Sequence, residues 1–493
     1  MAYNYIGRNY RPFTALCKND FGRKVIYTNQ TVITAENVVE ELNRALTVHK
    51  QNAMEIHYLD NYYRGDQPIL YRIKKNRPEV NNKVVVNLAQ FIVDVNASSV
   101  VSEPIQFVLK GDDQSKVAQL QELCGYFDDE DKNCDDIELC RWRSICGTAY
   151  RFVGKEDKDK LFAKAPFSLS VLNPEKTFVC YFSDKKPAFS ATEEIDEDNK
   201  TYYQVYTKSQ SFKIKDGKVA ITELNGNGEI PVVEYPNNAR RLSDIEVTIL
   251  MTDEINKLTA DRSNGIEQYV QAWVKFVNCD IDIEEFRKVR DEGFFSVTTN
   301  NGAENKSDVD IMSQELDQSQ SQVAVDDLFN KLLIIQGIAN REGNTGGDTG
   351  SAVELRNGHS AQEQKAMFNE PIFKRSEKAV LRLVLNRMNI KTQGKFNLTP
   401  RDIDIKITRN KNTNMLTKAE VLKILLDCGI DMATAIKTVD LFSDPERVAN
   451  DSRDRVQQVF DHNYGEEQQE VVPGVPTEEA TEEETNKSDV IKA

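Results

Sequence analysis

The sequence is poor in the residues on which common enzyme chemistries depend. It holds 4 histidines and 2 tryptophans, and no GxSxG, HExxH or Cys–His signature occurs. His57 and His359 fall on segments that we expect to be helical, whereas His49 and His462 look exposed. We therefore expect no catalytic histidine and no enzymatic activity of this kind.

Long apolar runs are also missing. None approaches the roughly 20 residues that a membrane-spanning helix needs. The N-terminal stretch MAYNYIGRNYRPF lacks the apolar core of a signal peptide. We therefore expect no membrane segment and a protein that is intracellular when it is made.

Cysteine is not arranged for metal binding or for disulfides. The 8 cysteines are scattered, and no CxxC occurs. The spacing of Cys134, Cys140 and Cys146 matches no zinc pattern. The sequence predicts free, buried thiols and no bound metal.

Negative charge is in excess, with 79 acidic against 63 basic residues and a net charge of −16. Such a chain repels nucleic acid at long range, which argues against a protein that reads DNA sequence. Hydrophobic residues make up 39% of the chain, a low share that fits an extended or ring-forming subunit better than a compact sphere. At roughly 100–200 residues per domain, the length indicates about three structural units, with one elongated body as the alternative.

A glycine-rich segment at 343–350 lacks the features of a phosphate-binding loop. Such a loop carries a Lys directly before its Ser or Thr, and it connects a strand to a helix. Here Gly350 precedes Ser351, and an expected helix leads into the segment. We expect no nucleotide hydrolysis, no cofactor, and a flexible connection between two long helices.

Paired aspartates suggest an alternative function. Three Asp-x-Asp pairs place two carboxylates on one face of an expected strand: Asp280/Asp282, Asp308/Asp310 and Asp402/Asp404. A nuclease that uses two metal ions needs convergent oxygens of this kind. No His or Lys accompanies the pairs in an acid–base spacing. We favour strands with a solvated polar face and keep a metal-dependent nucleic-acid-processing enzyme as the alternative.

Apolar periodicity predicts helices over much of the chain. One runs from about Ala35 to Tyr63, with Thr34 as its N-cap and Gly65 at its end. The other expected helices cover 115–147, 242–275 with Ser243 or Asp244 as cap, 321–341, 352–388, and short helices from the Thr417–Glu420 capping box onward. Pro371 lies inside the helix 352–388 and should kink it, because proline lacks the amide hydrogen and crowds the preceding turn.

Between these helices the pattern changes to short alternating strands. The expected strands are 103–108, 148–153, 178–182, 202–206 and 402–407, with a hairpin at 213–221 that turns at Asp216-Gly217. The fold class predicted from this mixture is α+β.

Several motifs occur in a characteristic order between about residues 50 and 460. They are the stretches 62–69 (YYRGDQPI), 82–87 (NKVVVN), 103–105 (EPI), 147–150 (GTAY), 172–174 (LNP), 230–238 (IPVVEYPNN) with 243–245 (SDI), 346–351 (GGDTGS) and 443–446 (SDPE). Their order, spacing and joint presence resemble bacteriophage portal proteins, the head-to-tail connectors of tailed phages. The closest resemblance is to portals of siphoviruses that infect Gram-positive hosts.

The resemblance implies an elongated α+β subunit with a wing, a helical stem, a small α/β clip, a long kinked helix and a helical crown. The implied parts are 1–241 wing, 242–275 first stem helix, 276–320 clip, 321–341 second stem helix, 342–351 tunnel loop, 352–410 kinked wing helix and return strand, 411–463 crown, and 464–493 a disordered acidic tail.

The resemblance also implies a function without catalysis. The subunits form a ring, expected to be a dodecamer, at one capsid vertex of the virion, after assembly in the host cytoplasm. Double-stranded DNA is packaged and ejected through its channel. The implied partners are the terminase large subunit, scaffold and major capsid protein, and a head-completion or adaptor protein. Another virion structural protein remains the second alternative.

The implied channel loop carries weakly polar and repulsive side chains, as sliding DNA requires. Its residues are Arg341, Gly343, Asn344, Thr345, Gly346, Gly347, Asp348, Thr349, Gly350 and Ser351. Arg341 and Arg356 are candidates for transient phosphate contacts, whereas Lys365, Lys374 and Arg375 could equally face neighbouring subunits.

Overall fold

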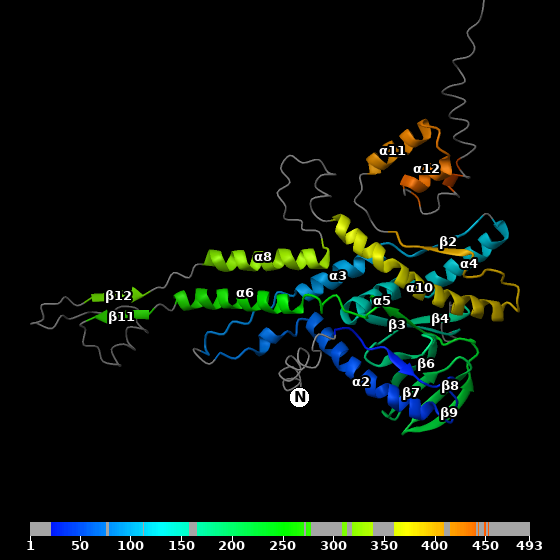
Figure 1. The fold of residues 1–493 in the computed structure, drawn as a ribbon, viewed down its shortest axis with the longest axis horizontal. Coiled ribbons are helices and arrows are strands. Elements are labelled where there is room, and N and C mark those ends of the chain that lie inside the picture. The colour runs from blue at the N-terminus through cyan, green and yellow to red at the C-terminus, as the bar shows by residue number, and fades with distance from the viewer. Residues whose placement is uncertain are drawn as a thin grey trace, which may run out of the picture. The chain divides into compact units, whose positions relative to one another are not determined.

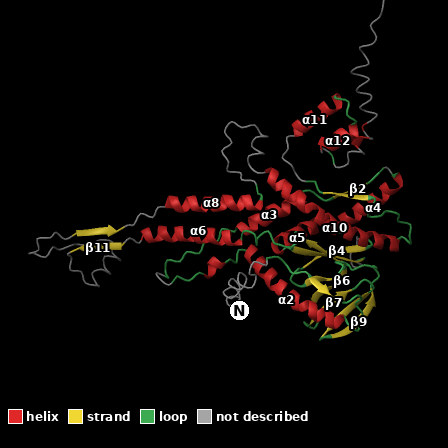
Figure 2. Cartoon of the chain, viewed as in Figure 1, coloured by secondary structure: helices red, strands yellow, loops and turns green. Residues whose placement is uncertain are grey.

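The computed structural model describes residues 21–74, 78–111, 113–156, 165–270, 273–277, 308–312, 318–338, 359–408 and 415–439, with Phe442, Val448, Ala449 and Ser452. The chain divides into two compact units, Met1–Asn410 and Lys411–Ala493. Helices and sheets are mixed along the first unit, which confirms the predicted α+β class (Figures 1 and 2).

A six-stranded sheet carries helix α2 (Val38–Tyr63) on one face. Its strands, in spatial order, are β1 (Ile26–Thr28), β5 (Thr177–Phe182), β6 (Pro187–Ile195), β7 (Thr201–Tyr206), β8 (Gln210–Lys215) and β9 (Lys218–Leu224). All neighbours are antiparallel except β1 and β5. Val38 and Leu42 of α2 are buried in one cluster with Phe178 and Phe189 of the sheet, because its apolar positions recur at helical spacing.

A three-stranded sheet forms the centre of the largest apolar core. Its order is β10 (Val232–Pro236), β3 (Thr148–Lys155) and β4 (Phe167–Leu172). Around it lie α3 (Leu88–Val101), α4 (Gln114–Asp129), α5 (Lys132–Cys146), α10 (His359–Lys391) and the two-stranded sheet of β2 (Gln106–Leu109) and β13 (Ile403–Lys406). Phe167, Tyr235 and Phe373 are buried together in this core.

Two antiparallel helices, α6 (Ile249–Val270) and α8 (Gln318–Gln336), lie side by side (Figure 1). Ile255 packs with Leu332 and Leu333 in one cluster, which also holds Leu88 and Ile92 of α3. Beyond the far ends of the helices, β11 (Trp273–Val277) pairs antiparallel with β12 (Asp308–Met312). In chain order, α6 is therefore followed by the two strands β11 and β12, and then by α8, which runs in the opposite direction to α6.

Several helix boundaries differ from the sequence prediction. Helix α2 begins at Val38 with Asn37 at its N-cap position, so the expected cap at Thr34 lies three residues too early. The expected helix 115–147 is broken into α4 and α5, because Asp131 adopts a left-handed conformation with φ 49°. Helix α8 ends at Gln336, where Gly337 has φ 67°.

Two further starts are shifted. Residues 244–248 form turns, so α6 begins at Ile249 and not at 242. In the second unit, α11 (Met415–Asp427) begins before Thr417, so the Thr417–Glu420 motif lies inside the helix and not at its cap. Helix α11 packs on α12 (Met432–Val439).

The hairpin prediction is confirmed, since Asp216 and Gly217 connect β8 to β9 with φ 51° and 72°.

Candidate functional site: a polar junction at the base of the paired helices

The residues of the expected tunnel loop lie outside the part of the chain that the structure describes. These are Arg341, Gly343, Asn344, Thr345, Gly346, Gly347, Asp348, Thr349, Gly350 and Ser351; Arg356, Asp280, Asp282, His462 and most of the expected clip and acidic tail lie outside it as well. Pro371 lies within α10. The site described below contains the residues that flank this loop in sequence.

Two of the motifs singled out in the sequence, at 147–150 and 230–238, meet in space. Strand β3 pairs with β10, which places Tyr150 opposite Glu234. Gly147 ends α5 with φ 84°, and a Cβ atom added there would lie 2.0 Å from the Arg241 carbonyl oxygen. The amide of Asn237 donates to the carbonyl of Gly147 at 2.9 Å. Only glycine permits this approach of two backbone segments.

The segment after β10 is shaped by its two asparagines. The side-chain amides of Asn237 and Asn238 donate to the carbonyl of Leu242 at 3.1 and 2.8 Å. The Asn238 side-chain oxygen accepts from the amides of Arg240 and Leu242. The turn that follows the motif is thereby closed by its own side chains.

The next residues, Ser243 to Glu246, form a capping box. Ser243 Oγ accepts from the Ile245 amide at 3.0 Å, and Glu246 accepts from the Ser243 amide at 2.8 Å. Ser243 Oγ also donates to the Ile145 carbonyl at 2.6 Å. Ser243 therefore caps the turn before α6, and the prediction that Ser243 or Asp244 caps the long helix was wrong. Glu246 was not among the predicted residues, although the Ser-x-x-Glu spacing could have revealed it.

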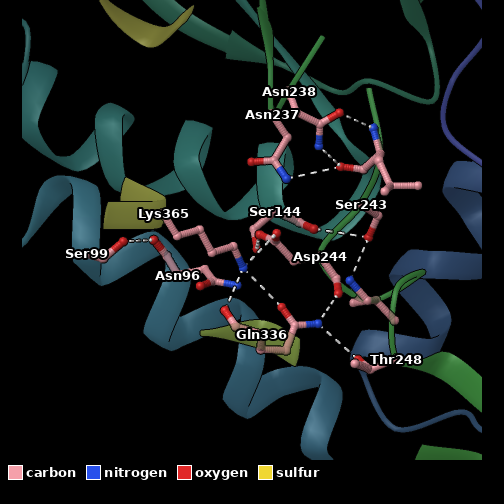
Figure 3. A network of polar contacts seen from close by, with 12 residues as sticks. Asn96, Ser99, Ser144, Asn237, Asn238, Ser243, Asp244, Thr248, Gln336 and Lys365 are labelled. Atoms are coloured by element: carbon pink, nitrogen blue, oxygen red, sulfur yellow. Dashed lines mark hydrogen bonds and ion pairs between the residues drawn. The ribbon is translucent and has the colours of Figure 1, made fainter. Parts of the chain in front are cut away.

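Asp244 lies at the centre of a network that joins three helices (Figure 3). Its side chain accepts from Ser144 Oγ at 2.6 Å, at the end of α5. Its carbonyl accepts from Gln336 Nε2 at 2.7 Å, at the end of α8, and the same amide group contacts Thr248 Oγ1 at 3.0 Å. Gln336 is only 1% exposed.

Lys365 brings α10 into this network. Its Nζ donates to the carbonyl of Gln336 at 2.9 Å and to its Oε1 at 3.2 Å, and it lies 3.7 Å from Asp244 Oδ1. Lys365 therefore contacts groups of its own chain. From the sequence, it could equally have faced a neighbouring subunit. Gln336 and Lys365 lie on either side of the expected tunnel loop in sequence, so the network fixes both helices that flank it.

A second polar cluster lies in the core beneath the junction. Arg151 is fully buried, and its guanidinium contacts Asp136 and Glu377 at 2.5 and 3.2 Å. Lys132 Nζ contacts the same two carboxylates at 2.7 and 3.1 Å. Tyr235 donates to Glu377 at 2.5 Å. Two cations and two anions thus bind α5, β3, β10 and α10 together.

The charges of this cluster stabilise one another. Burial by itself would raise the pKa of Asp136, but Lys132 and Arg151 outweigh it and hold the pKa below its usual value. Burial, together with Glu377, raises the pKa of Tyr235 well above its usual value. Asp136 is therefore expected to be ionised and Tyr235 protonated at neutral pH.

A third group joins the N-terminal segment to the same junction. Arg23 contacts Glu55 of α2 at 2.9 Å and Glu246 of the capping box at short distance. Arg241 pairs with Glu234, which also accepts from Tyr181 of the six-stranded sheet. The motif residues are thus structural connectors between α2, both sheets and the start of α6.

Histidine and cysteine positions correct two expectations. His49 is 6% exposed, packs on Phe178 and contacts the Glu175 carbonyl through Nε2 at 3.0 Å, so the expectation of an exposed side chain was wrong. Among the cysteines that the structure describes, all are free; Cys140, Cys146 and Cys180 are buried, but Cys134 and Cys428 are exposed. Cys17 and Cys279 lie outside the described residues.

Of the three aspartate pairs, Asp402/Asp404 is the one whose side chains the structure describes. Asp402 precedes β13 and accepts from the Thr399 amide and hydroxyl at 2.9 and 2.7 Å, while Lys116 lies 2.9 Å away. No cluster of three or more His, Cys, Asp or Glu side chains that could hold a metal ion occurs among the residues described. In the same residues, no helix has the length and apolar character to cross a membrane.

Comparison with known proteins assigns the chain at the level of family. A family model described as "Phage portal protein, SPP1 Gp6-like" matches residues 42–470. No curated protein matches the chain. Solved structures that match include a chain of "Neck of native GTA particle computed with C12 symmetry", with 11% identity, a TM-score of 0.37, and coverage of 72% of this chain and 90% of that chain.

Proposed function

The chain belongs to the phage portal protein family, and we propose that it is the portal subunit of a tailed bacteriophage. In this proposal the subunits form a ring at one capsid vertex, and double-stranded DNA enters and leaves the head through the ring. The ring, expected to be a dodecamer, is assembled in the host cytoplasm and becomes part of the virion. The observation that carries the proposal is the family match, which extends from α2 to beyond α12.

The paired helices supply the proposed stem. α6 and α8 run antiparallel, and the junction around Asp244 and Gln336 fixes their near ends to the body. We assign the strand pair β11–β12 and the residues between to the clip that meets the terminase large subunit and later the adaptor protein. α10, with Pro371, is assigned to the wing, and α11 and α12 to the crown.

The proposed loop at 342–351 contacts the DNA. A deletion of residues 346–350 is expected to leave ring assembly intact, because the ends of α8 and α10 are held by Lys365 and Gln336 independently of the loop. The same deletion is expected to impair DNA packaging. Loss of the ring in this variant would show that the loop has been placed wrongly.

Native mass spectrometry and negative-stain images of the purified protein test the proposal. We expect a ring with a central hole, no ATP hydrolysis and no DNA cleavage with Mg²⁺. A particle without a hole would favour another virion component. A stable monomer that cleaves DNA with a metal ion would favour the nuclease alternative and overturn the proposal.

A further inference from the structure

Arg143, in the last turn of α5, is a buried cation without a polar partner. The residue is 5% exposed, and its side chain makes no ion pair or hydrogen bond within the part of the chain that the structure describes. Its Cζ atom lies over the ring of Phe373 on α10, 5.1 Å from the ring centroid. An aromatic ring covers the face of a guanidinium but leaves its in-plane N–H groups without acceptors. Because arginine keeps its proton in proteins, this charge is not removed by titration.

A cavity of about 30 Å³ adjoins this guanidinium, between α3, α5 and the first half of α10. Arg143 lines the cavity; its Nε is enclosed without a partner, whereas Nη1 and Nη2 remain accessible. Asn369 of α10 lies in the same wall, one helical turn before Phe373, and its amide donates to no described group. Further wall residues are drawn in Figure 3: Asn96, Ser99, Ser144, Asn237, Asp244 and Lys365.

Four charged side chains line the cavity, and three of them have a partner of opposite charge. Asp244 and Lys365 face one another, with Oδ1 and Nζ 3.7 Å apart. Glu370 lies 2.7 Å from the Nζ atom of Lys374, on the next turn of α10. Arg143 is the fourth, and no carboxylate of the described residues lies within ion-pair distance of it. A buried charge without a partner is unfavourable in a protein interior, so the cavity lacks one negative charge.

We propose that this cavity binds one small monovalent anion of about the size of chloride. The Nη groups of Arg143 and the amide of Asn369 donate to the anion, and the contact with the guanidinium is charge-assisted. The volume admits about two water-sized particles, which is too little for a phosphate ester or a nucleotide. Asp244 and Glu370 in the same wall disfavour an anion of higher charge. Water fits the space as well, but it leaves the charge of Arg143 unbalanced. The proposal does not depend on the portal function.

Thermal unfolding of the full chain tests the proposal, with sodium gluconate replaced stepwise by sodium chloride or bromide at constant ionic strength. An anion that binds only the folded state raises its stability, whereas gluconate is too large for the cavity. We expect the melting temperature to rise saturably by about 1–2 °C in chloride and in bromide. Equal melting temperatures in all three salts would show that water alone fills the cavity and would overturn the proposal.

Two substitutions on α5 separate this site from general salt effects. Arg143→Gln removes the guanidinium at the cavity, and we expect the rise in melting temperature with chloride to disappear. Arg141→Gln removes an exposed guanidinium from the same helix, 3.7 Å from Asp94 and outside the cavity, and should keep the full rise. The same rise in both variants would mean that chloride acts elsewhere and would refute the assignment.

Asn369→Asp offers a test that leaves Arg143 in place. Asn369 lies four residues before Phe373, so the two side chains share one face of α10, and the new carboxylate lies in the wall of the cavity. Because the chain then supplies its own negative charge, we expect this variant to melt higher than the unmodified protein in gluconate and to lose its response to chloride. A lower melting temperature together with an unchanged chloride response would contradict the proposal.

Bromide locates the anion directly, without any substitution. In crystals of the unmodified protein soaked in sodium bromide, we expect an anomalous scattering peak in the cavity, within contact distance of the Arg143 Nη atoms. Peaks confined to the protein surface would indicate an adventitious ion only and would overturn the proposal.

Discussion

The core around Arg151 and the paired helices α6 and α8 differ in which side chains they bury. The core buries charged side chains, whereas the paired helices expose large apolar ones. In the core, Arg151 and Glu377 are fully buried and paired. Along the two helices, large apolar side chains are exposed: Leu250, Ile266, Val323, Ile334 and Ile335. A buried ion pair fixes the relative position of elements within one subunit, whereas an exposed apolar face is stabilised only when a partner covers it. Under the proposed function, that partner is a second copy in the ring.

The largest effect is expected from Gly147→Ala, which tests how tightly the junction is built. The new Cβ would lie 2.0 Å from the Arg241 carbonyl oxygen at a φ of 84°, so the backbone must move. We expect a loss of at least about 4 kcal/mol in the free energy of unfolding, measured by urea denaturation. Gly217→Ala is the control, because its Cβ meets nothing within 4 Å; it should lose about 1 kcal/mol. Equal losses would show that the close approach is unimportant.

The next effect concerns the buried charges. Glu377→Gln leaves Arg151 and Lys132 with Asp136 as the remaining carboxylate of the cluster, and we expect a loss of about 3 kcal/mol in the free energy of unfolding. The matched control is Asp327→Asn, which breaks an exposed pair with Lys331 on α8 and should change the stability by less than about 0.5 kcal/mol. If both variants unfold alike, the contrast between core and helices fails.

A smaller, pH-dependent effect is expected from His49. Burial lowers the pKa of this side chain to about 4, against an ordinary value of 6.5. Between these pH values the unfolded chain binds a proton that the folded chain does not, so stability is lost as the pH falls from 6.5 toward 4. The advantage of the unmodified protein over His49→Gln should shrink by about 2 kcal/mol between pH 7 and pH 5. A constant difference would show that His49 does not titrate in this way.

The smallest effect on the stability of a single subunit is expected from Ile334→Lys. This variant tests the exposed apolar face of the paired helices. Ile334 is 77% exposed, so the free energy of unfolding should change by less than about 0.5 kcal/mol. Ring yield in sedimentation velocity should nevertheless fall, because a charge replaces an apolar contact between copies. Ile195→Lys at the end of β6, 57% exposed, is the control. An unchanged ring yield for Ile334→Lys would exclude this face of α8 from the subunit interface.

Helix ends, turns and strands that depend on a few neighbouring residues were predicted correctly from the sequence. The Asp216-Gly217 turn, the end of α2 near Gly65 and the strands around 148–153 and 178–182 follow from turn chemistry and alternation over a few residues. Helix starts were less predictable. Apolar periodicity continues through residues 244–248, but these residues form turns, and the helix begins at Ile249.

The sequence revealed single motifs of the site but not the contacts between them. The motifs at Gly147 and at Asn237-Asn238 were visible in sequence, but nothing in their spacing shows that they touch. Of the buried cluster, only Lys132 and Asp136 lie one helical turn apart; Arg151, Tyr235 and Glu377 come from distant strands and from α10. The burial of His49 likewise depends on strand β5, more than a hundred residues later.

The sequence by itself determined the α+β class and the membership of the portal family, because apolar periodicity, turn residues and the order of the motifs can be read along the chain. Only the tertiary structure decided which of these parts share a contact. It brought Gly147 against Arg241 and enclosed Arg151 between two carboxylates. Burial and pairing of a charge depend on what arrives from elsewhere in the chain, and short-range patterns do not encode that.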